Sequence, residues 1–225
     1  MRRRLALLGA AGLLVLLPAS LSPALLATES LVEAVVTDER GQPVSDVVVS
    51  LVRSGGAPAA PRPTQAVMDQ QNKEFVPRVL AVSVGSPVTF PNRDNIRHHV
   101  YSFSSPKRFE LPLYIGTPAA PVVFDKPGAV VLGCNIHDWM VGYIVVVPTP
   151  YFAKTSEEGR ARVADLPPGT YEARVWHPRM RGEPEKTGKP ITVAAGDAGQ
   201  LSFVVPLKPE RKGPQRPTYE GGSQS

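Results

Sequence analysis

Residues 133–142, Gly-Cys-Asn-Ile-His-Asp-Trp-Met-Val-Gly, place a thiol, an imidazole and a thioether within seven residues. Cys134 is the only cysteine of the chain, and His137 and Met140 follow it at intervals of three. With four histidines and four methionines in 225 residues, chance seldom produces this spacing. The three side chains therefore form a candidate metal-ligand loop.

A further imidazole is available upstream in residues 92–100, Asn-Arg-Asp-Asn-Ile-Arg-His-His-Val. It follows alternating apolar residues at 80–90, which predict two half-buried strands. Adjacent strand residues face opposite sides, so only one of His98 and His99 can join the loop ligands. Periodicity does not choose between them, because Tyr101 and Phe103 share the face of His99.

The donor set of two imidazoles, a thiolate and a weak thioether favours copper that cycles between Cu(I) and Cu(II). Zinc takes Cys, His or carboxylate as its fourth ligand, and a thioether is a poor substitute. In isolation, Met140 between Trp139 and Val141 would be ordinary core packing, and Cys134 an inert buried thiol. Their shared spacing favours ligation of one copper ion.

Residues 1–27 predict a secretory signal peptide, with Arg2, Arg3 and Arg4 before an apolar run and small residues near its end. An uncleaved membrane anchor is the alternative, but the run is shorter than the ~20 residues of a spanning helix. We expect a periplasmic or secreted protein with no membrane span in the mature chain. In an oxidising compartment, metal coordination would protect a lone thiol.

Composition favours an all-β protein with very little helix, because proline makes up 25 of 225 residues and Val-rich runs alternate with turn residues. The net charge of +5 arises largely from the predicted signal peptide and from residues 207–225. The remainder is near neutral, which argues against nucleic-acid binding. Residues 207–225 are rich in Pro, Gly, Ser and Gln and predict a disordered tail.

The segments on either side of the metal-ligand region carry turn signals. Residues 31–53 predict a hairpin of two strands about an Asp-x-x-Gly turn, in which Gly41 can take a positive φ. Residues 54–64 read as a Gly/Ala/Pro linker. Further turns at 154–159 and 166–169 precede a second pair of predicted strands.

These outer segments resemble the carboxypeptidase regulatory-like β-sandwich, which carries a leading strand, Asp-x-x-Gly-x-Pro-Val, a Val-rich strand, Thr-x-x-x-Gly and Leu-Pro-x-Gly-x-Tyr. The resemblance implies a small sandwich of the Ig/transthyretin-like kind in two halves, residues 28–53 and 149–206. A simple two-domain tandem is the alternative arrangement.

The middle of the chain, residues 65–148, resembles a cupredoxin. The matching motifs are Glu-Phe-Val-Pro at 74–77, Gly-Ser-Pro-Val-Thr-Phe-Pro-Asn at 85–92, His-His-Val at 98–100, Lys-Pro-Gly at 126–128 and the loop at 134–142. It is most similar to plastocyanin-like proteins labelled methylamine-utilisation proteins, and Cys-x-x-His-x-x-Met is the compact ligand loop of amicyanin. The resemblance implies a Greek-key β-sandwich, inserted in or joined to the outer one, with copper at one end.

The family's ligands map by resemblance onto four positions: His98, Cys134, His137 and Met140. Cupredoxins usually have Asn after the first ligand, whereas this chain has His99. In the family, the loop histidine has an edge near solvent, so His137 would be the port for electrons, with Trp139 as a docking aromatic or a lid. The resemblance implies a type 1 copper electron carrier whose partner is a redox protein such as a c-type cytochrome or a dehydrogenase.

Other functions have less support from the sequence. A multicopper enzyme needs further histidines, and only His99 and His177 remain, the latter expected at a strand end. No Ser-His-Asp, phosphate-binding or paired-carboxylate motif stands out, so we expect no enzyme activity. Two alternatives stay open, a copper-binding carrier without electron transfer and a structural module in which copper is incidental.

Overall fold

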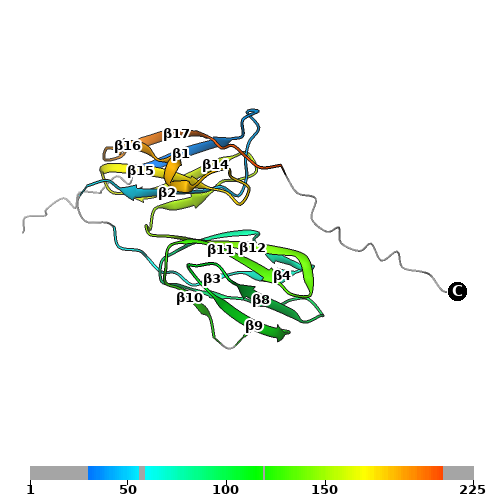
Figure 1. Ribbon diagram of the computed structural model, residues 1–225. Helices are drawn as coiled ribbons and strands as arrows, with labels where there is room; N and C mark the ends of the chain where they lie inside the picture. The colour runs from blue at the N-terminus through cyan, green and yellow to red at the C-terminus, as the bar shows by residue number, and fades with distance from the viewer. Residues whose placement is uncertain (1–29, 56–58, 119, 210–225) are drawn as a thin grey trace, which may run out of the picture.

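The structure, a computed structural model, describes residues 30–55, 59–118 and 120–209. Within these ranges it contains seventeen strands and one short 3-10 helix, η1 (Pro184–Thr187), which confirms the predicted all-β class (Figure 1). The predicted signal peptide and residues 210–225 of the predicted tail lie outside the described residues. No described helix has the length and apolar character that a membrane span requires.

Seven strands form an outer sandwich of two sheets (Figure 1). The first sheet has the order β14-β1-β17, with bounds Arg160–Leu166, Ser30–Thr37 and Ala198–Val204. The second has the order β13-β2-β15-β16, with bounds Phe152–Lys154, Val48–Arg53, Gly169–Trp176 and Lys189–Val193. Buried side chains from both sheets, including Leu51, Tyr171 and Phe203, form one hydrophobic cluster between them.

The ten strands β3 to β12 form a central body (Figure 1). One sheet has the order β10-β7-β3, with bounds Val122–Phe124, Ser86–Thr89 and Ala66–Val67. The larger sheet has the order β6-β12-β11-β8-β9, with bounds Val79–Ser83, His137–Val147, Gly128–Cys134, His98–Ser102 and Phe109–Tyr114. A hairpin pairs β4 (Asp69–Gln71) with β5 (Glu74–Val76). The core of this body is a second cluster, in which Phe90, Phe124 and Leu132 are almost wholly buried.

The central body interrupts the outer sandwich along the chain, because β3 to β12 lie between β2 and β13. Figure 1 shows the two bodies stacked. They meet at a small valine cluster of Val48, Val79, Val145 and Val147. Beside it, Lys154 Nζ donates to the Val79 carbonyl at 3.2 Å and lies 2.6 Å from Asp46 Oδ1. Apolar contact and a hydrogen bond therefore join the two bodies.

The predicted hairpin over residues 31–53 is wrong. β1 and β2 lie in different sheets, although the turn between them begins as a hairpin, with Thr37 bridged to Pro43 and the Val44 amide bonded to the Val36 carbonyl. Asp46 then adopts φ 58°, a left-handed conformation that turns the chain away from β1. β2 thereby pairs with β13 and β15 on the opposite face of the core.

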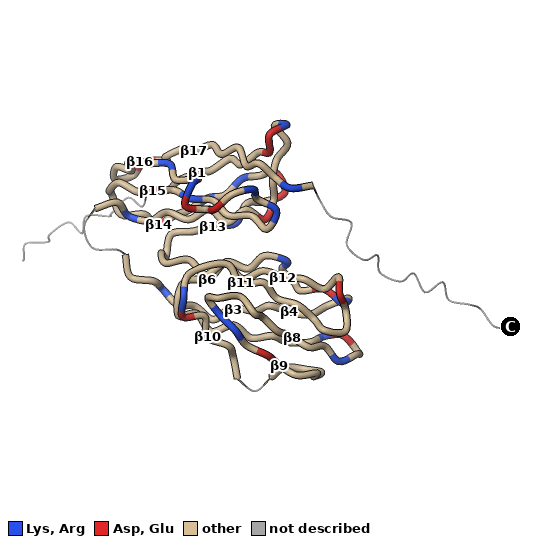
Figure 2. Tube along the Cα trace, viewed as in Figure 1, with Lys and Arg blue, Asp and Glu red and all other residues tan. Residues whose placement is uncertain are grey.

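Lys and Arg are interspersed with Asp and Glu over both bodies (Figure 2). Several opposite charges are paired, as in Lys107 with Asp125 at 3.4 Å and Arg174 with Glu172 at 2.7 Å. The folded part therefore presents no stripe of a single sign in this view, in keeping with its near-neutral predicted charge.

Candidate metal centre

Three of the predicted ligands meet at one end of the central body. His98 begins β8, Cys134 ends β11 and His137 begins β12. Cys134 Sγ lies 3.9 Å from His98 Nδ1 and 3.6 Å from His137 Nδ1, and the potential ligand atoms all lie within 4.8 Å of one another. The two imidazole rings are 4.9 Å apart between centroids. The structure thus brings together side chains from positions 36 residues apart.

A register shift in the β11–β12 pair builds the loop. Gly133 pairs with Val141, but the next residue, Cys134, pairs with His137, so residues 138–140 have no Cα partner on β11. In a regular strand, residues three apart face opposite sides, and a bulge of this kind resets the alternation. His137 and Met140, which are three residues apart on β12, are accordingly both buried, with 9% and 1% of their surfaces exposed.

Met140 belongs to the hydrophobic cluster that also contains Cys134 and Leu132. It lies on β12, three residues after His137, and its side chain faces the interior of the central body. This position supports packing as well as ligation. Its role as the fourth ligand stays a prediction.

His98 and His99 differ in their surroundings as adjacent strand residues should. His98 faces the Cys134 thiol and is fully buried. His99 lies against the Tyr101 ring at 5.7 Å between centroids, and its Nε2 is 3.0 Å from Glu110 Oε1. That nitrogen has no partner with hydrogen-bond geometry, so its contact with Glu110 is not a hydrogen bond.

His98 is held from behind by a carboxylate that the sequence analysis did not identify. Asp94 Oδ2 lies 2.7 Å from His98 Nε2, the ring nitrogen that faces away from Cys134. Asp94 also accepts hydrogen bonds from the backbone amides of Asn72 at 2.7 Å and Lys73 at 2.8 Å. Burial alone would raise the pKa of Asp94, but the hydrogen bonds from Lys73, His98 and Asn72 hold it below its ordinary value. The carboxylate is therefore ionised at neutral pH.

His137 lies between two rings. Its centroid is 4.9 Å from that of His98 and 5.1 Å from that of Trp139, whose buried Nε1 has no hydrogen-bond partner. Burial, together with the neighbouring His98, lowers the pKa of His137. The neutral ring therefore predominates at neutral pH, leaving a lone pair for a metal.

The nitrogen–sulfur separations in the cluster fit a shared metal ion. With the bond lengths of zinc sites, ~2.0 Å to nitrogen and ~2.3 Å to sulfur, two ligands at 120° lie about 3.7 Å apart. The observed separations of 3.9 and 3.6 Å lie on either side of that value. Two imidazoles and one thiolate are the donors of blue-copper sites. The residues present therefore fit copper, with His98, Cys134 and His137 as the holding groups.

His177, the remaining histidine, belongs to the outer sandwich. It follows β15, and its Nδ1 accepts a hydrogen bond from the Arg179 amide at 3.2 Å. The structure does not bring it to the metal-ligand cluster, in agreement with its predicted position at a strand end.

His177 is expected to make folding sensitive to acid. Burial, aided by the charge of Arg179, lowers its pKa to about 4. An unfolded histidine binds a proton near pH 6.5, so between these values the unfolded state binds more protons and stability falls as pH falls. The free energy of unfolding falls by about 3 kcal/mol at most over this pH range. Urea unfolding measured from pH 7 to pH 4 should show a smaller decline in the free energy of unfolding for His177→Gln than for the natural chain. Equal dependence of the free energy of unfolding on pH in the two proteins would contradict this.

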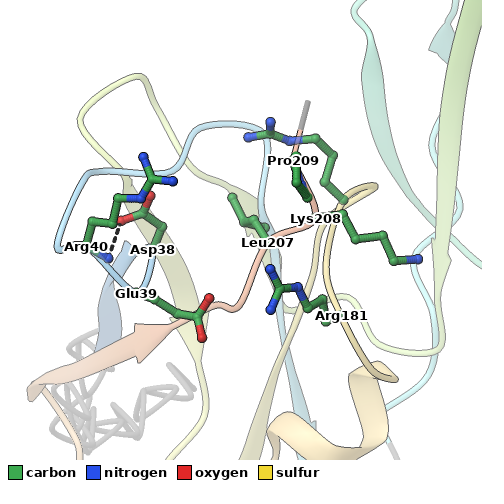
Figure 3. A pocket seen from close by; sticks show the side chains of 8 residues that line it. Asp38, Glu39, Arg40, Arg181, Leu207, Lys208 and Pro209 are labelled. Carbon is green, nitrogen blue, oxygen red and sulfur yellow. Dashed lines mark hydrogen bonds between the residues drawn. The ribbon is translucent and has the colours of Figure 1, made fainter. Parts of the chain in front are cut away.

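A separate hollow lies on the outer sandwich (Figure 3). Asp38 and Glu39 face Arg181 and Lys208 across it, and the Asp38 carboxylate accepts the backbone amide of Arg40 at 2.8 Å. It contains none of the predicted ligands. Its mixed charges give no reason to place the metal chemistry there.

No protein-family model and no curated protein matches the chain. Among solved structures, a purple cupredoxin from Nitrosopumilus maritimus is 26% identical over 37% of this chain and 98% of its own, with a TM-score of 0.32. An oxidised amicyanin variant is 22% identical over 44% of this chain and 99% of its own, with a TM-score of 0.34. A copper-containing nitrite reductase from Thermus scotoductus SA-01 is 28% identical over 51% of this chain and 28% of its own, with a TM-score of 0.35.

Fold and site together define an all-β protein in which a cupredoxin-like β-sandwich holds a His-Cys-His cluster. The structural neighbours reported above include cupredoxins. Their TM-scores lie below 0.5, so the functional proposal rests on the side chains of the site itself.

Proposed function

We propose that this protein is a type 1 copper protein that carries single electrons between redox partners outside the cytoplasm. The observation that carries the proposal is the convergence of His98 Nδ1 and His137 Nδ1 on the buried thiol of Cys134. Met140 is the proposed weak fourth ligand. A copper ion held there would supply a one-electron couple between Cu(II) and Cu(I).

The strands of the central body give the ligands fixed positions. Cys134 is at the end of β11, which is paired on both sides, with β12 and with β8. His98 is fully buried, and its ring is hydrogen-bonded to the Asp94 carboxylate. Ligands held in this way limit the rearrangement that accompanies a change in copper charge.

His137 is the proposed port for electrons. About 9% of the His137 surface is exposed to solvent, whereas His98 is fully buried. The contact between the His137 and Trp139 rings supports a role for Trp139 as a cover over the port. The proposed partner is a redox protein such as a c-type cytochrome or a dehydrogenase, and we propose no enzyme activity for this chain.

The outer strands are proposed to form a carboxypeptidase regulatory-like sandwich from residues 28–53 and 149–206. The order of β1, β2 and β13 to β17 in its two sheets supports this division. The interface with the central body supports a role in holding the copper-binding sandwich in place. The proposed compartment is the periplasm or the exterior, with residues 1–27 as the signal peptide.

The test is the visible absorption and EPR spectrum of the purified protein after Cu(II) addition, followed by a reductive titration. We expect an intense thiolate-to-copper band, narrow hyperfine splitting and reversible reduction by one electron per copper. Met140→Leu should shift the band and the reduction potential, whereas Met180→Leu, in the core of the outer sandwich, should change neither. A protein that binds Cu(I) tightly but stays colourless with Cu(II) would overturn the electron-carrier proposal in favour of copper carriage.

A further inference from the structure

We infer that Asp94 is a positioning residue that fixes the tautomer and direction of His98 and lowers the reduction potential of the site. This inference rests on the proposed copper function. It begins with the 2.7 Å contact between Asp94 Oδ2 and His98 Nε2, at a histidine side chain with no solvent exposure.

The hydrogen bonds at Asp94 determine which nitrogen of His98 carries the proton. An ionised carboxylate only accepts hydrogen bonds. Both oxygens of Asp94 act as acceptors here, one for the Asn72 amide and the other for the Lys73 amide. The contact with His98 is then a hydrogen bond only if Nε2 carries the hydrogen. Nδ1 is then the ring nitrogen that is left to bind a metal, and it lies 3.9 Å from Cys134 Sγ.

The β4–β5 turn holds the carboxylate from one side. Asn72 and Lys73 have φ values of 55° and 60°, so both central residues of the turn are left-handed, as in a type I′ hairpin. This conformation presents their two consecutive amides to the two oxygens of Asp94. The side chain of Asp94 is 15% exposed, and its hydrogen bonds to the two turn amides lie at the surface.

Asn92 holds the loop of Asp94 from the other side. Its Oδ1 accepts the Asp94 amide at 3.0 Å, and its Nδ2 donates to the carbonyls of Ile96 at 2.9 Å and Tyr114 at 2.8 Å. Tyr114 is the Cα partner of His98 across the β8–β9 pair. Asp94 is thus connected to the strand that carries the ligand as well as to the β4–β5 turn, and it cannot swing away from His98 without breaking several hydrogen bonds.

A histidine that donates to a carboxylate is a stronger donor at its other nitrogen. Stronger donation stabilises Cu(II) more than Cu(I), because the higher charge gains more from electron density on the ligand. Asp94 should therefore raise the affinity for copper and lower the reduction potential.

The chain offers a matched control at the neighbouring histidine. His99 Nε2 lies 3.0 Å from Glu110 Oε1 on the outer face of the same strand, away from Cys134. Asp94→Asn and Glu110→Gln each remove one carboxylate charge beside one histidine. Only the first should change the metal site.

The first experiment uses the metal-free protein, with nitrogen-15 NMR of the imidazole rings. We expect His98 to be protonated at Nε2, with a slowly exchanging proton, in the natural chain and in Glu110→Gln. Asp94→Asn should lose this protection or show the other tautomer. Asp94→Ser is a second variant, since its hydroxyl ends one bond short of the carboxylate oxygens and removes the charge beside His98. An unchanged His98 signal in both Asp94 variants would overturn the inference, whatever metal the protein binds.

The second experiment measures copper affinity and reduction potential. Asp94→Asn should bind Cu(II) about 10–100-fold more weakly, and a tenfold greater loss for Cu(II) than for Cu(I) would raise the potential by about 59 mV. Glu110→Gln should match the natural chain. Natural protein that gives no blue spectrum refutes the proposed function, and the NMR result then decides the role of Asp94 alone. A blue natural protein with equal potentials in both variants refutes the tuning role alone.

Discussion

Replacing Cys134 with serine is expected to abolish the intense visible band of the copper-loaded protein. The band requires a thiolate donor, and a serine hydroxyl does not ionise near neutral pH to replace it. Copper affinity should fall by more than about 100-fold, because a direct ligand is lost rather than a supporting group. His98 and His137 remain, so any residual Cu(II) should give the spectrum of an ordinary nitrogen and oxygen site. Absorption and EPR at equal copper loading measure both effects.

The adjacent histidines supply the control for this experiment. His98→Gln should also lose the band, whereas His99→Gln, which changes the neighbouring side chain on the opposite face, should retain it. Folding of each variant is checked by its urea midpoint. A band that persists in the Cys134→Ser protein would refute the proposed site, since the chain has no other cysteine.

The candidate site was partly predictable because much of its chemistry is local in sequence. Cys134, His137 and Met140 lie within one loop, and their spacing alone indicated a metal. The choice of His98 over His99 needed the family resemblance, because periodicity left both open. The structure now places His98, and not His99, against the Cys134 thiol.

The support for the site was not predictable from the same sequence. Asp94 lies in a loop with no periodicity, and its partners Asn72 and Lys73 come from a turn more than twenty residues earlier. The orientation of those amides depends on two left-handed residues, neither of which is glycine. Patterns of residue type do not report hydrogen bonds between separate loops.

The fold shows the same division between local and distant information. Val-rich runs and turn residues correctly predicted the all-β class, and the described residues contain only one short 3-10 helix. The hairpin over residues 31–53 failed, because the pairing of β2 is decided by Asp46 at φ 58° and by partners β13 and β15, which lie about a hundred residues further on. The turn could be predicted from the residue types, whereas the move of the chain to the other sheet could not.

Gly159→Ala is expected to destabilise the outer sandwich strongly, by about 4 kcal/mol. Gly159 has φ 70°, and an added Cβ would clash with the Val36 carbonyl oxygen, a backbone atom that cannot rotate away. The same oxygen accepts the Val44 amide, and the Val36 amide donates to the Gly159 carbonyl at 2.8 Å. Relief of the clash must therefore move β1 and break bonds that join it to the neighbouring turn. Urea unfolding followed by far-ultraviolet circular dichroism gives the loss of free energy.

Gly41→Ala separates the clash from the backbone conformation. Gly41 has φ 76°, close to that of Gly159, but an added Cβ would meet nothing within 4 Å. Gly41→Ala should lower the free energy of unfolding by about 1–2 kcal/mol, the cost of a left-handed backbone at a residue with a Cβ. An equal decrease in the two variants would refute the clash at Gly159. In Gly159→Ala the copper band should persist at urea concentrations that unfold the outer sandwich. The ligands belong to a separate core, and the two bodies are joined by a small apolar cluster and the hydrogen bond from Lys154 to the Val79 carbonyl. Loss of both signals at one urea concentration would instead show that this interface makes the copper site depend on the sandwich around it.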